Sequence, residues 1–266
     1  TVCESNRRYM IREIPGVNPE KIRVSYNGID LSLFTPGDGP REPMSIFGVG
    51  RLIEKKGFDH LIRAVAVLRD QQLPVVCRIA GDGRDQKALE RSIRKLKLES
   101  HVQLLGPLRQ DEVKEHLKRA ACFALPCVQA KDGNVDALPT VLLESLASGC
   151  PTVSTRLSGI PEIIEDGTSG LLVEPGTHKP LAEAIRRILV DEALAARLAD
   201  GGLRRARERF DGRTNVAVMR RWLTQSATPA KDRQPRMDRS EPEAAPTDST
   251  TVPVADASDP ATSEAA

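Results

Sequence analysis

The chain has 266 residues, of which 39 Lys and Arg and 37 Asp and Glu give a formal net charge of +2. Only 3% of the residues are aromatic, which is too few for the stacking platforms that bind nucleic acid. The sequence also contains no run of about 18 apolar residues, the length that a membrane-spanning helix needs. The five cysteines show no Cys-x-x-Cys spacing and the four histidines do not cluster with them. We therefore expect free buried thiols, no bound metal and a cytoplasmic location.

The first 36 residues contain a helical pattern over 5–14, a run with strand character over 22–26 and a turn-rich stretch over 27–36. Short apolar runs then alternate with amphipathic segments, and near-continuous apolar runs are typical of strands buried on both faces of a parallel sheet. The predicted strands cover 44–50, 75–81, 102–106, 122–126, 152–156 and 170–173. The predicted helices between them cover 58–68, 85–97, 110–120, 139–149 and 160–165. This alternation predicts a doubly wound, Rossmann-like α/β fold with a parallel sheet.

After Pro180 only helical patterns follow, over 181–190, 192–210 and 215–223. From Ser226 the composition shifts to Ala, Pro, Ser, Thr and acidic residues without an aromatic side chain. Such a segment buries too little apolar surface to offset the entropy that ordering costs. We therefore predict a disordered tail over 223–266.

The stretch GVGRLIEKKG, residues 48–57, lies between a predicted strand and a predicted helix. Glycine allows backbone N–H groups to approach a phosphate, and the side chains of Arg51, Lys55 and Lys56 can neutralise its charge. The stretch is not the dinucleotide-binding fingerprint, because Ile53 stands where that motif has glycine, and it is not a Walker loop. The alternative interpretation is a glycine turn with solvated basic side chains.

Two further loops follow predicted strands, GDGRD at 81–85 and GPLRQDE at 106–112. The first fits a turn in which Asp82 or Asp85 caps the next helix. In the second, a backbone group could meet a nucleotide base, although the pattern alone indicates only a loop and a helix start.

The stretch DALPTVLLESLASGCP, residues 136–151, places one carboxylate, Glu144, in an otherwise apolar helix. A buried carboxylate without a partner is costly, so something should meet it. Pro139 suits the first helical position, and the free N–H groups of the first turn favour phosphate or sugar oxygens in front of the helix. Asp136 lies in the preceding loop, and carboxylates accept charge-assisted hydrogen bonds from sugar and ribose hydroxyls. Alternatively, Glu144 meets solvent or a basic side chain and Asp136 only caps the helix.

These motifs, with ASGCPTVST, SGIPEII and DGTSGLLVEPG further along, occur in the order seen in the nucleotide-sugar half of GT-B glycosyltransferases. Residues 1–222 most resemble the large retaining family that includes sucrose, mannosyl and bacterial polysaccharide transferases. The resemblance implies that 1–36 is a remnant of an N-terminal acceptor domain with its linker. It also implies that 37–222 is the nucleotide-sugar-binding domain.

The resemblance further implies roles for individual residues. Arg51 and Lys56 match the pair that holds the donor diphosphate and stabilises the charge developing on it. Glu144 matches the acid that binds the ribose hydroxyls, and Asp136 matches the acid that contacts the donor sugar. The implied catalytic residues are Arg51, Lys56 and Asp136, and the implied donor-binding residues are Gly50, Arg51, Lys56, Leu108, Asp136, Ala137, Leu138, Thr140 and Glu144.

Two positions depart from the family pattern. Asp136 stands where the family has Glu, which shortens the reach of the acid by one methylene. Ala137 stands where glycine is usual, and its Cβ atom disfavours a close approach of the backbone to the sugar there.

The implied function is donor binding in a glycosyltransferase that moves a sugar from a UDP-, GDP- or ADP-sugar to an acceptor in polysaccharide or glycoconjugate synthesis, without a cofactor. A saccharide or lipid-linked acceptor would bind through the missing N-terminal domain, and the full-length protein would associate peripherally with a membrane. The chain alone would then be inactive, and its helix over 213–223 would expose Val216, Met219 and Trp222. The alternatives are a non-catalytic nucleotide-sugar-binding module and a nucleotide-sugar epimerase or phosphorylase of the same fold.

Overall fold

The computed structural model describes residues 1–226. Most of the tail predicted over 223–266 lies outside the described residues, whereas 223–226 belong to the last helix, α9 (Gly212–Ser226).

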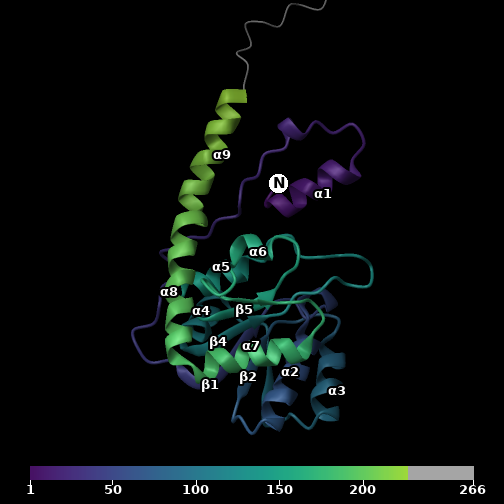
Figure 1. The fold of residues 1–266 in the computed structure, drawn as a ribbon, viewed down its shortest axis with the longest axis vertical. Helices are drawn as coiled ribbons and strands as arrows, with labels where there is room; N and C mark the ends of the chain where they lie inside the picture. Colours follow the sequence, from purple (N-terminus) through teal and green to yellow (C-terminus); the bar gives the residue numbers. More distant parts are fainter. Residues whose placement is uncertain (227–266) are drawn as a thin grey trace, which may run out of the picture. The chain divides into compact units, whose positions relative to one another are not determined.

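A six-stranded parallel sheet forms the centre of the fold (Figure 1). Its strands are β1 (Glu42–Val49), β2 (Val76–Ala80), β3 (Val102–Gly106), β4 (Ala120–Leu125), β5 (Thr152–Thr155) and β6 (Leu171–Val173). They lie in the order β3-β2-β1-β4-β5-β6, so the chain crosses from the β3 edge back to the centre before β4. This is the doubly wound arrangement that the apolar runs predict, and each of the six predicted strands is confirmed.

Helices cover both faces of the sheet (Figure 1). On one face α2 packs against α3 and α7, and on the other α5 packs against α4 and α8. The bounds are α2 (Phe58–Asp70), α3 (Gln86–Lys95), α4 (Gln110–Arg119), α5 (Thr140–Ala147), α6 (Ile160–Ile163), α7 (His178–Val190) and α8 (Glu192–Arg209), with short 3-10 turns η1 (Pro19–Lys21) and η2 (Glu54–Lys56). Among residues 1–226, no helix is both long and apolar enough to cross a bilayer.

The core lies between the sheet and these helices. Phe47 and Phe123 are paired in register on β1 and β4, and both are about 1% exposed or less. The ring of His116 on α4 stacks on Phe47 at a centroid distance of 4.8 Å. The five cysteines are buried free thiols, as expected, and burial raises the pKa of Cys77 to about 12.

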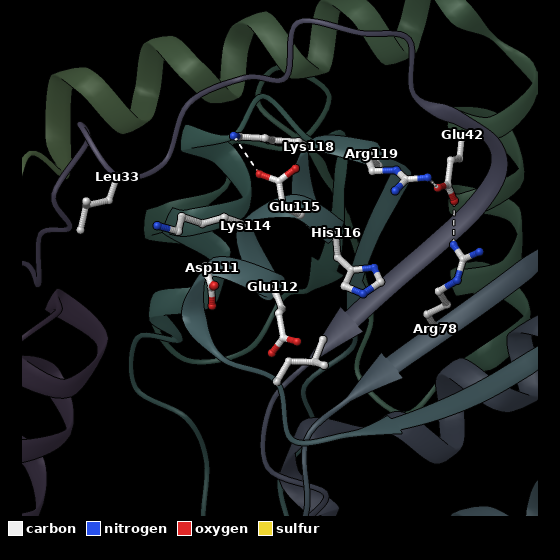
Figure 2. Close-up of a pocket in the computed structure, with 11 residues that line it drawn as sticks. Leu33, Glu42, Arg78, Asp111, Glu112, Lys114, Glu115, His116, Lys118 and Arg119 are labelled. Carbon is white, nitrogen blue, oxygen red and sulfur yellow. Dashed lines mark hydrogen bonds and ion pairs between the residues drawn. The ribbon is translucent and has the colours of Figure 1, made fainter.

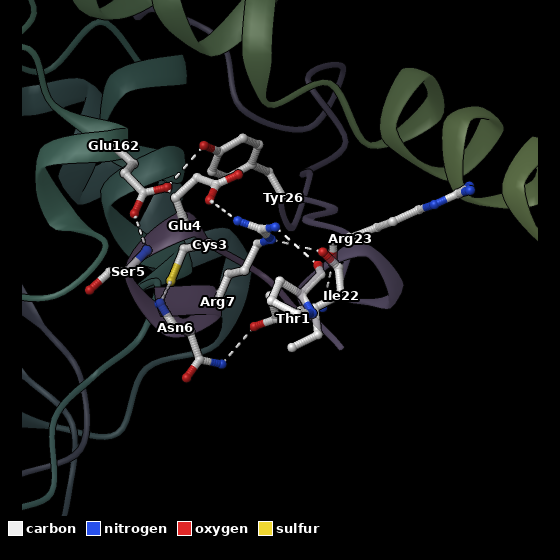
Figure 3. A network of polar contacts seen from close by, with 11 residues as sticks. Thr1, Cys3, Glu4, Ser5, Asn6, Arg7, Ile22, Arg23, Tyr26 and Glu162 are labelled. Atoms are coloured by element: carbon white, nitrogen blue, oxygen red, sulfur yellow. Dashed lines mark hydrogen bonds and ion pairs between the residues drawn. The ribbon is translucent and has the colours of Figure 1, made fainter. Parts of the chain in front are cut away.

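The N-terminal helix α1 (Glu4–Glu13) is held against α6 by one carboxylate (Figure 3). Glu162 of α6 accepts hydrogen bonds from the backbone N–H groups of Glu4 and Ser5, both at 2.8 Å, and from the Tyr26 hydroxyl at 2.9 Å. The fully buried thiol of Cys3 donates to the Ala137 carbonyl, with sulfur and oxygen 3.6 Å apart. The first residues of the chain therefore contact the loop that carries Asp136.

The strand predicted over 22–26 is wrong. Residues 22–28 form no strand, and the Ile22 carbonyl instead accepts a hydrogen bond from the Arg7 guanidinium at 2.9 Å. A β-branched run becomes a strand only where another strand offers its backbone groups, and none of the described strands pairs with this one.

The expectation that α9 exposes three apolar side chains holds for two of them. Val216 is 63% exposed and Met219 is 43% exposed. Trp222 is half-buried, and the Arg23 guanidinium lies 5.4 Å from its ring centroid, which is a cation–π contact.

Gly57 joins η2 to α2 with a φ of +70°, and a Cβ atom there would lie 1.9 Å from the Pro126 carbonyl oxygen. The substitution Gly57→Ala should therefore lower the free energy of unfolding by about 2–4 kcal/mol, because it combines left-handed strain with a forced shift of the next loop. Urea unfolding measures this loss. Gly16→Ala is the control, since Gly16 has a φ of +72° with no atom within 4 Å, and it should cost only about 1–2 kcal/mol. Equal losses in the two variants would contradict the close approach.

Candidate functional site

The candidate site lies where the sheet changes its winding direction. β1 and β4 are neighbours, but the segment after β1 leads to α2 on one face while the segment after β4 leads to α5 on the other. Two loops that diverge in this way leave a crevice at the carboxyl ends of the strands, where such folds bind ligands. The Val128 backbone N–H donates to the Lys55 carbonyl at 3.0 Å, which ties the two loops together.

A cavity of about 350 Å³ opens at this point. Its wall combines an apolar side with a few polar groups, as small-molecule sites do. The lining residues are Val49, Gly50, Lys56, Leu108, Gln110, Val113, Thr140, Val141 and Glu144. Five of the residues predicted from the sequence thus surround one cavity, although they come from three separate stretches of the chain. The sequence analysis missed four lining residues, Val49, Gln110, Val113 and Val141, whose side chains carry no signal beyond strand or helix periodicity.

Glu144 borders this cavity without a partner. Among residues 1–226, no side chain or backbone group forms a hydrogen bond or an ion pair with its carboxylate. Burial alone raises the pKa of this carboxyl. Of the alternative interpretation, pairing with a basic side chain is therefore wrong for residues 1–226, whereas contact with solvent agrees with the partial exposure of Glu144.

Asp136 has the opposite environment. Its two carboxylate oxygens lie 2.9 Å from the Lys55 ammonium and 2.7 Å from the Lys56 ammonium, and each of these three side chains is at most 14% exposed. Burial would raise the pKa of Asp136, but the hydrogen bonds and charges of Lys56 and Lys55 outweigh it and lower that pKa. The alternative in which Asp136 merely caps α5 is wrong, because Pro139 occupies the cap position and no side chain caps this helix.

The other predicted residues lie beside the cavity. Arg51 lines a separate hollow of about 280 Å³ together with Lys55, Arg84 and Asn134, among others, and its side chain is exposed. The Ala137 carbonyl accepts from the backbone N–H of Gly159 at 3.1 Å, so that oxygen is already engaged. Asp136, Ala137 and Leu138 line neither hollow. The structure therefore does not bring Arg51 and Lys56 together as a pair in the 350 Å³ cavity.

A larger groove of about 530 Å³ follows α4 and shares Leu108 with the cavity (Figure 2). Its charged side chains largely neutralise one another: Glu42 lies 2.7 Å from Arg78, and Glu115 lies 3.1 Å from Lys118. Burial lowers the pKa of His116, which points into the groove. Among the charged side chains of this groove in the described chain, Lys114 forms no ion pair, and no unpaired carboxylate stands beside it as Glu144 stands beside Lys56.

Comparison with known proteins assigns the family. Residues 38–205 match the family described as glycosyl transferases group 1, and the chain belongs to this family. It is 36% identical over 213 residues to WcaL of Escherichia coli (strain K12), named as a glycosyltransferase of colanic acid biosynthesis, and the match covers 78% of this chain and 51% of WcaL. The chain spans about half the length of the curated relatives it matches.

Two solved structures share the fold. HepE of Anabaena, whose structure holds UDP and glucose, superposes with a TM-score of 0.74 and 26% identity, over 84% of this chain and 61% of HepE. The C-terminal domain of LpcC, a glycosyl transferase group 1 family protein of Francisella tularensis, superposes with a TM-score of 0.60 and 22% identity. That match covers 69% of this chain and 99% of the LpcC domain, so the fold is that of a C-terminal domain in this family.

The unpaired state of Glu144 has a consequence for stability. A carboxyl whose pKa is raised in the folded state stabilises the fold only while protonated, and this contribution is lost as the pH rises from the unfolded pKa of about 4.3 through the folded one. Glu144→Gln should therefore unfold at a higher temperature than the unsubstituted chain at pH 7, and the difference should vanish near pH 4. Thermal unfolding followed by circular dichroism at both pH values measures this. A destabilised Glu144→Gln chain at pH 7 would show that the carboxylate has a partner.

The matched substitution Asp136→Asn should act with the opposite sign. Because the pKa of Asp136 is lowered, its stabilising contribution is present at neutral pH and disappears as the pH falls through the folded pKa. Asp136→Asn leaves two half-buried ammonium groups without their acid, so the chain should lose about 1–3 kcal/mol at pH 7. The decrease in the free energy of unfolding caused by Asp136→Asn should become smaller in acid. A decrease that stays constant from pH 7 to pH 3 would contradict the ion pairing.

Proposed function

We propose that the 350 Å³ cavity binds a nucleoside diphosphate sugar and that this chain is the donor-binding part of a glycosyltransferase. One observation carries the proposal: Glu144, whose carboxylate has no partner among residues 1–226, and the Lys56 ammonium face the same cavity at the switch point of the sheet. A ligand that suits both must present neutral hydroxyl donors to the acid and negative charge to the cation. A ribose joined to a diphosphate has these two features at adjacent positions.

The rest of the cavity suits the remaining parts of such a ligand. Val49, Leu108 and Val113 give the wall an apolar side that can take a flat base. Thr140 begins α5 at the cavity, and the unpaired N–H groups of a helix's first turn, with the positive end of its dipole, favour phosphate oxygens. Gly50 leaves room for a phosphate beside the Lys56 side chain.

In the proposed reaction, the bond between the sugar and the diphosphate breaks and negative charge grows on the leaving diphosphate. Lys56 would stabilise this charge in the cavity, and Arg51 would have to turn from its neighbouring hollow to contribute. Asp136 would orient the sugar, and the family resemblance favours retention of the anomeric configuration. The relative WcaL is named for colanic acid biosynthesis. We extend this to the whole protein, which would act in the synthesis of a bacterial polysaccharide.

Nucleotide titration tests this proposal. HepE holds UDP, so UDP is the first nucleotide to test by calorimetry, followed by GDP and ADP. We expect one of them to bind, and Glu144→Gln to weaken that binding about 10- to 100-fold, because each lost hydrogen bond to a charged group is worth about 1.5–3 kcal/mol. Glu99→Gln, at an exposed glutamate on the turn before β3, is the matched control and should leave affinity unchanged. The proposal fails if none of the three nucleotides binds at millimolar concentration.

We further propose that transfer requires the part of the relatives that this chain does not cover. The cavity accounts for a donor, and the chain spans about half the length of the curated relatives it matches, so we place acceptor binding in the part that it does not cover. The 266-residue chain should therefore bind the donor and release no more sugar from it than a Lys56→Met variant does, as measured by nucleotide release. Sustained transfer to an added saccharide by this chain would overturn the requirement.

A further inference from the structure

Two lysines reach Asp136 from different sides. Lys56 lines the 350 Å³ cavity together with Gly50 and Glu144, whereas Lys55 lines the 280 Å³ hollow together with Asn134. Their ammonium groups contact different oxygens of the same carboxylate, at 2.7 Å for Lys56 and 2.9 Å for Lys55. A ligand in the larger cavity therefore meets Lys56 but not Lys55.

Lys55 is fixed more firmly than Lys56. Its ammonium also donates to the Asn134 side-chain oxygen at 3.1 Å, and its carbonyl accepts from the Val128 N–H at 3.0 Å. Asn134 is itself held in a turn, because its carbonyl accepts from the Ala130 N–H at 2.9 Å and its N–H donates to the Asp132 carboxylate at 2.9 Å. Among residues 1–226, the Lys56 ammonium contacts only Asp136. Lys56 is therefore the cation that an incoming anion can capture.

Lys56 can leave Asp136 for an anionic ligand at a low energetic cost only if Lys55 remains paired with that carboxylate. The charged and titratable groups that face this carboxylate are Lys55 and Lys56 from η2 and the thiol of Cys127, 3.8 Å away, from the loop after β4. Burial raises the pKa of that thiol to about 12, so it stays neutral at physiological pH. If a diphosphate draws Lys56 away, Lys55 is the one remaining cation among these groups, and a half-buried carboxylate without any counter-ion is costly.

We propose that Lys55 is the fixed counter-ion of Asp136 and a positioning residue for donor-sugar recognition. It holds the carboxylate in place while Lys56 moves to the diphosphate, so that Asp136 can accept hydrogen bonds from the sugar hydroxyls. Asp136 is one methylene shorter than the glutamate usual in the family, so its position depends closely on what holds it. This inference rests on the proposed function and adds a division of labour between the adjacent lysines.

The test compares affinities for a nucleoside diphosphate and for the matching nucleotide sugar, measured by calorimetry with UDP and UDP-glucose, or with the pair whose nucleotide binds best. Lys55→Met should lower the affinity for the nucleotide sugar about tenfold while changing the affinity for the nucleoside diphosphate less than threefold. Lys56→Met should weaken both ligands, and Lys95→Met, at an exposed lysine of α3, should change neither. If Lys55→Met weakens the binding of both ligands equally, Lys55 is a phosphate ligand. If it weakens the binding of neither, Lys55 has no role in recognition. Either result overturns the inference.

A measurement without ligand separates this inference from the proposed function. In carbon-13-labelled protein, the Asp136 carboxyl should titrate at a higher pH in the Lys55→Met chain than in the unsubstituted chain, while Lys55→Arg, which keeps the charge, should restore the original titration. Asn134→Ala, a milder change at an exposed turn, should shift the titration in the same direction as Lys55→Met but by less. Unchanged titration in Lys55→Met would overturn the counter-ion role. Failure of the unsubstituted chain to bind any nucleotide would instead overturn the proposed function.

Discussion

The site depends on the pairing of β1 with β4. These strands are distant in sequence, yet Ile46 pairs with Cys122 and Phe47 with Phe123 in the centre of the sheet. Their carboxyl ends therefore lie side by side, and the two following loops leave from the same edge toward opposite faces. Gly57 allows those loops to touch, since any side chain there would collide with the Pro126 carbonyl. Without this register, the cations of η2 and the acids of the β4–α5 segment would not share one edge of the sheet.

The two acids of that segment are placed in contrasting environments. Asp136 is neutralised by two ammonium groups, which lower its pKa, whereas Glu144 has no partner in the described chain and burial raises its pKa. An acid that is already paired adds to the stability of the free protein, while an unpaired acid in a cavity wall opposes it. Such a cost at a cavity is typical of a group that is satisfied by a ligand rather than by the fold.

The sequence alone predicts the fold almost completely, because buried parallel strands leave continuous apolar runs and each run from β1 to β6 is bounded by turn residues. The failed strand over 22–26 has the same local composition, and what distinguishes it is that none of the described strands lies beside it. The half-buried state of Trp222 was also not predicted, because the Arg23 guanidinium that lies over its ring comes from the other end of the described chain.

The site was predictable in part. Order and spacing placed Lys56 in the loop after one strand and Glu144 in the helix after another, and the structure has both at one cavity. Sequence could not assign different partners to Lys55 and Lys56, because the 3-10 turn of η2 decides which side each lysine faces. Nor could it show that Arg51 points into another hollow. The roles of these residues toward a ligand remain predictions.

The most direct test of the account is a crystal structure of the chain with the nucleoside diphosphate that it binds most tightly. The account predicts the ribose hydroxyls within about 2.6–3.2 Å of the Glu144 carboxylate and the phosphates at Lys56, with Asp136 still joined to Lys55. A nucleotide seated instead in the groove along α4, beside Arg78 and His116, with Glu144 still without a partner, would contradict it.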